Sequence, residues 1–566
     1  MSKLSALKSA ESLVDFAELL DTPSSALIHV LYRTPEASKY ITFDIAKKSG
    51  GTRTIHAPVG KLKFYQRALA DILYDCVAEL ESANRRKPLS HGFRKERSIF
   101  SNASQHKRRR FVFNLDLEDF FPTFHFGRVR GFFIKDRDFA LKPECATILA
   151  QIACFQGSLP QGSPCSPIIA DLITHILDVR LVRFAKQHRV TYSRYADDLT
   201  FSTNEKTFPK ALASISKAGR WEPARPLLDL IESFDFRVNL AKTRMHVRGS
   251  RQTVTGLTVN EKVNISQAYW RTTRSMCHAL FQTGTYYKPN SLPGGDNTAS
   301  LTDLRPLKGM LAHIQHIKNA SHIRPTPEKN GLNFYGQRLH EDFHFYDNFV
   351  NLGRPVIITE GKTDPIYLRN AIQRLSKYQP VLGQATRHGF EYGIKFFNCE
   401  STVAKILRLT GGSDLLKTFA KNYPHQLKRY KYKPLQYPTI ILLDNDSGLT
   451  HFGKMVQGTY KINVATTTTN PFYHLTDNLY LVKTPELGLN GKSCIEDMFD
   501  AKTKAIPLDG KVFHPDEKTF DATKHINKAQ FAKIVVPRNA AVIDWTGFND
   551  LLDRIYAVID DYVPPT

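Results

Sequence analysis

Three aspartates in two short motifs have the residue type and spacing to bind divalent cations. Asp197 and Asp198 follow Tyr195 and Ala196 within 191–202, a segment predicted to form a β-hairpin, and Asp116 ends a predicted strand at 111–116. Phosphoryl transfer to a nucleic-acid 3′ or 2′ hydroxyl uses two divalent cations about 4 Å apart, which carboxylate oxygens bind well. Taken singly, each aspartate could be a solvated surface residue. Together they predict a polymerase-type site that binds Mg²⁺.

The elements that must position these acids mix strands with helices. Residues 61–83 carry apolar side chains at helical spacing, and 167–188 is predicted to be a helix that begins at a proline. Loop or linker composition marks 283–306 and 324–331. After residue 350 the pattern changes to apolar strands that end in acids, which places a domain boundary at 345–352. The first part is therefore predicted to be α+β, and the second part α/β.

Composition limits the class of protein. The chain has 566 residues, so two or more domains are expected, and 78 Lys and Arg against 54 Asp and Glu give a net charge of +24. Nucleic acid is the favoured partner of such a chain; an anionic membrane surface is the alternative, but no apolar run approaches the ~20 residues that span a bilayer. The seven cysteines form no Cys-x-x-Cys pair, which argues against a zinc site or a disulfide framework. With no signal-peptide-like apolar start, we expect a cytoplasmic protein.

A proline-containing turn between the two acid motifs completes a recognisable order. Asp116 with Phe120 and Phe121 comes first, then Leu-Pro-Gln-Gly at 159–162, then Tyr-Ala-Asp-Asp at 195–198. In this order the chain resembles a reverse transcriptase. The resemblance implies a right-hand polymerase fold of fingers, palm and thumb, catalytic and metal-binding roles for the three aspartates, and a place for Gln161 in the nucleotide pocket.

Three further residues match segments of reverse transcriptases. Phe121 falls where the family has a ring that clashes with a ribose 2′-hydroxyl and so favours dNTPs; the alternative is a core aromatic. Lys242, in Val-Asn-Leu-Ala-Lys-Thr, resembles a lysine that protonates the pyrophosphate leaving group, or is an ordinary surface lysine. Arg53, in Gly-Thr-Arg-Thr-Ile, resembles the fingers arginine that contacts the triphosphate.

Two short elements narrow the resemblance to retron reverse transcriptases. One is Asn-Ala-x-x-His at 102–106, followed by a basic run that could contact phosphates or be a solvated face, and the other is Val-Thr-Gly at 254–256. The resemblance covers about residues 45–320. It implies binding of a cognate noncoding RNA (msr-msd), priming from an internal guanosine 2′-OH, and a branched RNA–DNA product (msDNA). The residues implied to bind this RNA are Asn102, His106, Arg108, Arg109, Val254, Thr255 and Gly256.

A second group of acids follows apolar strands in the C-terminal part. Glu360 follows 356–359, and Asp444 and Asp446 follow 439–443, so all three are expected at the carboxyl edge of a parallel sheet, with Asp364 beside them. This pattern resembles a Toprim domain, a Rossmann-like α/β fold that binds Mg²⁺ or Mn²⁺. Glu496, in Lys-Ser-Cys-Ile-Glu-Asp, resembles a further acidic ligand of the nuclease branch. Nothing resembles a topoisomerase tyrosine or a primase zinc module, so nuclease is the favoured activity.

The whole pattern predicts a retron reverse transcriptase fused to a Toprim effector in bacterial antiphage defence. The msDNA would control the nuclease in a toxin–antitoxin manner, with a nucleic acid as the nuclease substrate and a homo-oligomer with msDNA as one possible assembly. The alternatives are an intron-encoded or diversity-generating reverse transcriptase with an accessory domain, or a C-terminal part that serves only as a nucleic-acid-binding scaffold. The predicted parts are an N-terminal helical extension at 1–45, fingers and palm at 46–265, a thumb-like helical region and linker at 266–345, and the effector at 350–566.

Overall fold

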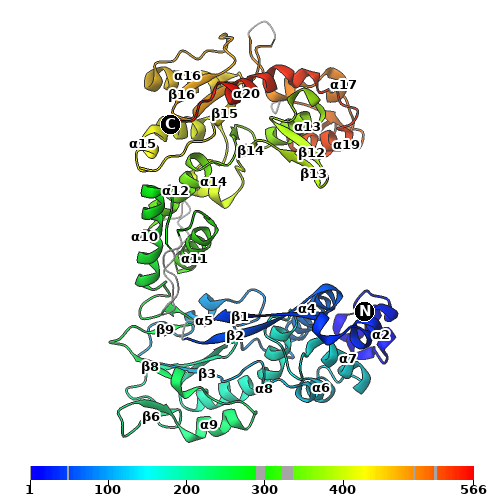
Figure 1. Cartoon of the computed structure of the whole chain (residues 1–566), viewed down its shortest axis with the longest axis vertical. Helices are drawn as coiled ribbons and strands as arrows, with labels where there is room; N and C mark the ends of the chain where they lie inside the picture. Colours follow the sequence, from blue (N-terminus) through cyan, green and yellow to red (C-terminus); the bar gives the residue numbers. More distant parts are fainter. Residues whose placement is uncertain are drawn as a thin grey trace. The chain divides into compact units, whose positions relative to one another are not determined.

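Apolar faces of helices and strands build two separate units in the computed structural model (Figure 1). The structure describes residues 2–47, 50–287, 300–321, 336–487, 491–515 and 519–565. Of these, the first unit contains the residues up to 270 together with 313–321, and the second contains 271–287, 300–312 and 336–565. The predicted linker at 324–331 and residues 288–299 of the predicted loop at 283–306 lie outside the described residues.

The first unit is an α+β fold around a four-stranded antiparallel sheet of order β4-β5-β3-β8. Its sheet strands are β3 (Phe111–Asp116), β4 (Thr191–Tyr195), β5 (Asp198–Thr203) and β8 (Arg244–Val247). Three hairpins accompany the sheet: β1 (Tyr40–Ala46) with β2 (Thr52–Pro58), β6 (Ala213–Ile215) with β7 (Trp221–Pro223), and β9 (Thr253–Val254) with β10 (Leu257–Thr258). Its main helices are α1 (Lys3–Ser9), α2 (Leu13–Leu19), α3 (Ser24–Ile28), α4 (Gly60–Ser82), α5 (Ile99–Ser104), α6 (Phe126–Lys135), α7 (Pro143–Ala153), α8 (Ser166–Gln187) and α9 (Arg225–Glu232).

The helices predicted at 61–83 and 167–188 are confirmed as α4 and α8. Helix α4 buries Leu62, Leu69 and Leu73 on one face, as the helical spacing of its apolar residues requires. The N-terminal helices bury Leu7 and Phe16 in the same apolar core. The predicted limit of an N-terminal extension at residue 45 cuts through strand β1, because β1 pairs along its whole length with β2.

The second unit is an α/β fold around a five-stranded sheet of order β14-β11-β15-β17-β16. All its pairings are parallel except that of β16, and the strands predicted at 356–359 and 439–443 are confirmed as β11 and β15. Its strands are β11 (Val356–Thr359), β14 (Lys395–Phe396), β15 (Thr439–Leu443), β16 (Tyr473–Thr476) and β17 (Leu479–Lys483). Its helices include α12 (Gln337–Phe345), α13 (Asp364–Arg374), α14 (Thr402–Leu407), α15 (Ser413–Leu427), α16 (Ser447–Tyr460) and α18 (Lys528–Gln530).

The division between units differs from the boundary predicted at 345–352. Helices α10 (Gln267–Thr283) and α11 (Arg305–Ser321) cross it, and α12 lies wholly in the second unit. The physical reason is apolar burial: Phe281, Leu311 and Phe345 share one core with strand β11. None of the described helices is long and apolar enough to cross a membrane.

Candidate active sites

The three palm aspartates lie together at one end of the antiparallel sheet. Asp116 ends β3 and pairs directly with Asp198, the first residue of β5. Asp197 lies in the turn between β4 and β5, and the backbone N–H of Leu117 donates to its carbonyl oxygen at 2.9 Å. Ala196 has φ +56°, the left-handed conformation that a tight hairpin tip requires. The structure therefore brings together the acids that the two motifs predict.

Electrostatics at this tip favour a bound cation. Burial, followed by the charges of Asp197 and Asp116, raises the pKa of Asp198 to about 7, and burial also raises the pKa of Asp197. The ammonium of Lys242 lies 2.8 and 3.0 Å from the two carboxylate oxygens of Asp116. Across the described part of the chain, no three His, Cys, Asp or Glu side chains already surround a common metal position. The donor set itself, three mutually repelling carboxylates beside a cation, suits Mg²⁺ chemically.

A cleft of about 1240 Å³ is lined by Asp116 and Asp197 and by the predicted nucleotide-binding residues. Arg53 from β2, Phe121 and Gln161 line it together with Asp116 and Lys242. Phe121 is half-buried, with its ring 6.0 Å from the Phe93 ring and 5.5 Å from the Phe120 ring. The Phe121 ring faces the open cleft, as a ring that excludes a ribose 2′-hydroxyl would, and it also packs on other aromatic rings, as a core residue would.

The Leu-Pro-Gln-Gly turn closes one wall of the cleft against the β1–β2 hairpin. The N–H of His56 donates to the Gln161 carbonyl at 2.8 Å. Gly162 has φ +116°, and a Cβ there would lie 2.8 Å from the His56 oxygen. Only glycine fits this conformation and this approach.

Sequence reasoning missed the buried residues that support the β4–β5 hairpin. Arg194 of β4 is fully buried, and its guanidinium donates to Asp171 at 2.8 Å and to Asp178 at 2.8 Å. Gly92 packs so closely on the hairpin tip that a Cβ would lie 2.4 Å from the Ala196 nitrogen. The two aspartates, seven residues apart on a largely apolar helix, were a signal that a buried cation must pair with them.

Asn102 and His106 form part of the palm interior. Both are fully buried, and His106 places Nδ1 2.7 Å from the Ser202 hydroxyl and Nε2 2.7 Å from the Ser193 hydroxyl. The Ser193 hydroxyl donates to the Asn102 side-chain oxygen at 2.6 Å. The expectation that these two side chains contact RNA directly disagrees with this burial, because their polar atoms are turned toward β4 and β5.

The Val-Thr-Gly element lies beside the helix that carries Asn102. Val254 is buried, while Thr255 and Gly256 form the β9–β10 turn, and the Thr255 hydroxyl donates to the Ile99 carbonyl at the start of α5 at 3.2 Å. The two short elements, about 150 residues apart in sequence, are thus neighbours. Arg108 is exposed, whereas Arg109 is half-buried and donates to the Thr191 hydroxyl. The exposed residues of the predicted RNA-binding set therefore lie at this turn and in the basic run.

The predicted acids of the C-terminal part gather at the carboxyl edge of the parallel sheet. Glu360 directly follows β11, and its N–H donates to the Leu442 carbonyl of β15 at 3.1 Å. Asp364 begins α13 and accepts from the Gly361 N–H at 2.8 Å. Asp446 caps α16 by accepting from the Gly448 N–H at 2.7 Å. Open α/β sheets place their sites at this edge.

These acids are close enough to perturb one another. Burial, followed by the charges of Asp364, Glu496 and Glu360, raises the pKa of Asp444 to about 8. Burial and the Glu496 charge raise the pKa of Asp364 to about 6, and burial and Asp446 raise that of Glu360. One carboxylate oxygen of Glu360 is buried with no hydrogen-bond partner among the described residues. Such a group of coupled carboxylates fits a divalent cation.

Lys528 belongs to this second site and was not predicted. Its ammonium lies 3.1 Å from a carboxylate oxygen of Glu496, which is almost completely buried. No local motif marks Lys528, because only the folded chain brings α18 to the turn that contains Glu496.

Comparison with known proteins gives matches for the first half of the chain. Residues 45–261 match the family described as reverse transcriptase (RNA-dependent DNA polymerase). The chain is 34% identical over 281 residues to the retron Mx65 reverse transcriptase of Myxococcus xanthus, covering 47% of this chain and 62% of that protein. It is 30% identical over 289 residues to the retron Ec86 reverse transcriptase of Escherichia coli, covering 50% of this chain and 79% of that protein. The chain thus spans less than two thirds of the Mx65 protein.

Solved structures of telomerase are also similar to this chain. Telomerase from Candida albicans in complex with a TWJ fragment of telomeric RNA has a TM-score of 0.30 and 11% identity, covering 54% of this chain and 58% of that chain. Apo telomerase from Candida tropicalis has a TM-score of 0.29 and 14% identity, covering 45% of this chain and 54% of that chain.

Proposed function

Because this chain belongs to the retron reverse transcriptases, we propose that its first unit copies RNA into DNA. The observation that carries the proposal is the direct pairing of Asp116 with Asp198, beside Asp197, under a cleft lined by Arg53 and Gln161. The intron-encoded and diversity-generating alternatives are set aside, because the relatives are retron enzymes.

Each residue of the cleft has a role in this proposal. Asp116, Asp197 and Asp198 would hold Mg²⁺, and the bound cations would activate the priming hydroxyl and neutralise the triphosphate. Arg53 binds triphosphate oxygens, Gln161 orients the nucleotide, and Phe121 excludes a ribose 2′-hydroxyl. Lys242, whose ammonium donates to the Asp116 carboxylate at 2.8 Å, is the group that donates a proton to the pyrophosphate in this proposal.

The template in this proposal is a cognate noncoding RNA, and the product is msDNA that begins at a guanosine 2′-OH. Half-buried Thr255, exposed Gly256 and exposed Arg108 are the surface residues that support RNA binding. Asn102 and His106 act indirectly, because they connect the helix beside this turn to the catalytic hairpin.

RNA-templated dNTP incorporation by the purified full chain tests the polymerase proposal. Asp116→Asn should abolish incorporation, whereas Asp235→Asn should leave it unchanged, because Asp235 is exposed and lies outside the cleft. Equal incorporation by both variants would exclude Asp116 from the active site.

For the second unit, we propose a Toprim-type metal-dependent nuclease that the msDNA controls in antiphage defence. Support comes from five acids at the carboxyl edge of a parallel sheet, with Asp444 and Asp364 strongly perturbed by their neighbours. Glu360, Asp364, Asp444, Asp446 and Glu496 would hold Mg²⁺ or Mn²⁺, which supplies an activated water for phosphodiester cleavage. Lys528 neutralises part of this charge through Glu496.

Cleavage assays on the full chain separate the nuclease from a scaffold. Glu360→Ala should abolish cleavage and cellular toxicity and spare DNA synthesis, because Glu360 lies in the second unit and the polymerase acids in the first. If the unaltered chain, freed of msDNA, cuts neither DNA nor RNA with Mg²⁺ or Mn²⁺, the second unit is a nucleic-acid-binding scaffold.

A further inference from the structure

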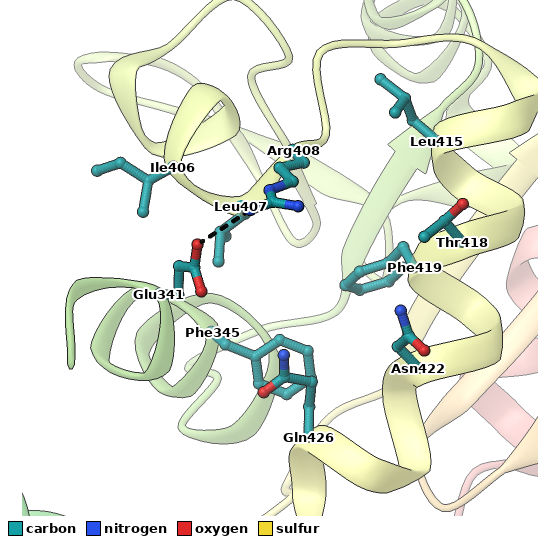
Figure 2. A pocket seen from close by; sticks show the side chains of 10 residues that line it. All are labelled: Glu341, Phe345, Ile406, Leu407, Arg408, Leu415, Thr418, Phe419, Asn422 and Gln426. Carbon is teal, nitrogen blue, oxygen red and sulfur yellow. Dashed lines mark ion pairs between the residues drawn. The ribbon is translucent and has the colours of Figure 1, made fainter. Parts of the chain in front are cut away.

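A hollow of about 370 Å³ lies on one face of helix α15 in the second unit (Figure 2). Its apolar wall comes from three elements: Phe345 of α12, Leu407 of α14, and Leu415 and Phe419 of α15. The Phe345 and Phe419 rings are tilted by 46° with centroids 6.0 Å apart. Phe345 is almost completely buried and stacks on Tyr430, so half-buried Phe419 supplies the accessible ring surface of the hollow. We call this feature the α15 hollow.

Hydrogen-bonding groups lie along one side of the α15 hollow. Asn422 and Gln426 project from α15 one turn apart, and both line it (Figure 2). The side-chain oxygen of Gln426 is buried and has no hydrogen-bond partner among the described residues. A buried acceptor without a partner is costly, and a ligand that donates to it would remove that cost. Opposite, Arg408 lies 3.9 Å from Glu341.

Helix α15 begins next to the second group of acids (Glu360, Asp364, Asp444, Asp446 and Glu496), which we call the acid site, and carries the α15 hollow along its length. The Gly412 N–H, immediately before α15, donates to the Glu360 carbonyl at 3.2 Å. Leu415, the first lining residue of the helix, comes three residues later, and the lining face continues to Gln426. At 1.5 Å per residue this face is roughly 16 Å long, the length of two or three nucleotides in an extended strand.

Three cationic residues lie in or next to the lining of the α15 hollow, against one lining carboxylate, that of Glu341. Lys405 and Lys421 are exposed, and each adjoins a lining residue in sequence, while Arg408 is itself in the lining. Lys417, one turn before Lys421, is paired with Asp414. Aromatic surface to hold a base, amides to bond its edge and nearby cations for phosphates are the combination that binds single-stranded nucleic acid.

We propose that the α15 hollow binds one unpaired nucleobase of a single-stranded DNA or RNA whose backbone runs along α15 toward the acid site. Phe419 contacts the base above the buried Phe345 ring. Asn422 and Gln426 bond the edge of the base, and Lys405, Arg408 and Lys421 contact phosphates. This inference rests on the proposed nuclease function and names its substrate class as single-stranded nucleic acid. Charge favours a polyanion over an apolar protein segment as the occupant.

Site-specific photocrosslinking on the full chain tests the inference. In the Asp198→Asn background, which makes no DNA in the proposed scheme, short single strands carrying 5-iododeoxyuridine or 5-iodouridine should crosslink within 413–427 or at Phe345. The Asn422→Ala/Gln426→Ala double variant should bind these strands about tenfold more weakly. Gln457→Ala removes an exposed amide on the neighbouring helix α16 and should bind as the parent does. The DNA and RNA probes separate the two sources of the base.

The outcomes distinguish this inference from the nuclease proposal. Glu360→Ala should keep the crosslink and lose cleavage. Crosslinks on α15 with no cleavage by any variant would overturn the nuclease function and leave the base site standing. Crosslinks only elsewhere, unchanged binding by the double variant, or a protein crosslinked to 413–427 in place of the strand would overturn the base site.

Discussion

Replacing His106 with alanine should both destabilise the palm and slow catalysis. Because the Ser193 hydroxyl donates its only proton to Asn102, it must accept from Nε2–H of His106, and Nδ1 must then accept from the Ser202 hydroxyl. Burial lowers the pKa of His106 to about 3, so the ring stays neutral and this direction holds at neutral pH. These hydrogen bonds connect the α5 segment to both strands of the β4–β5 hairpin.

The size of the effect follows from what His106→Ala leaves behind. Loss of the hydrogen bond from His106 to Ser193 costs about 1 kcal/mol, because the Ser193 hydroxyl still donates to Asn102. Loss of the acceptor for the buried Ser202 hydroxyl costs about 1–3 kcal/mol. The cavity left by the ring adds to this, for a total of about 3–5 kcal/mol in the free energy of unfolding. If the bonds fix the hairpin, kcat for dNTP incorporation should fall tenfold or more with little change in KM.

Hydrogen exchange of peptides from β4 and β5 during urea unfolding measures the loss in the free energy of unfolding, and primer extension measures the change in kcat. Thr174→Val is the matched control, because this buried hydroxyl bonds only the Ala170 carbonyl of its own helix. It should cost less than about 1.5 kcal/mol and leave kcat unchanged. A loss below about 1 kcal/mol in His106→Ala, with unaltered kcat, would refute the reasoning.

Three other perturbations test the two sites. Gly92→Ala should displace the hairpin tip and lower kcat in incorporation assays. Gly131 lies in open space within α6, so Gly131→Ala should raise the free energy of unfolding by about 0.5–1 kcal/mol in urea unfolding. Asp198 and Asp444 bind protons more tightly in the folded than in the unfolded protein, so the stability of the metal-free protein should fall as pH rises from about 4 through 8. Replacing either aspartate with Asn should weaken the dependence of the melting temperature on pH. Phe121→Val should raise use of rNTPs relative to dNTPs, on the order of tenfold in competition assays; unchanged selectivity would make Phe121 a core aromatic.

Local motifs predict much of this fold and both acid groups. Asp116 and Asp198 could be placed at one site from sequence, because Asp116 ends an apolar strand and Asp198 follows the short turn between two others. The positions of Glu360 and Asp444 follow in the same way, since parallel buried strands are continuous apolar runs that end at one edge.

Longer-range features could not be predicted, for physical reasons visible in particular residues. Asn and His have the same hydrogen-bonding groups whether they face RNA or buried serines, so the Asn-Ala-x-x-His motif alone could not reveal the inward direction of Asn102 and His106. Lys528 reaches Glu496 only through tertiary packing. The apolar faces of α10 to α12 fit any core, and sequence does not say that they join the second unit.

The central claim, that the first unit makes DNA on an RNA that it binds, is tested most directly by the nucleic acid that copurifies with the chain. Sequencing after purification of the unaltered chain should recover DNA joined to an RNA guanosine, and the Asp197→Asn/Asp198→Asn variant should carry the RNA alone. RNA-linked DNA of normal length and amount in that variant would contradict the account.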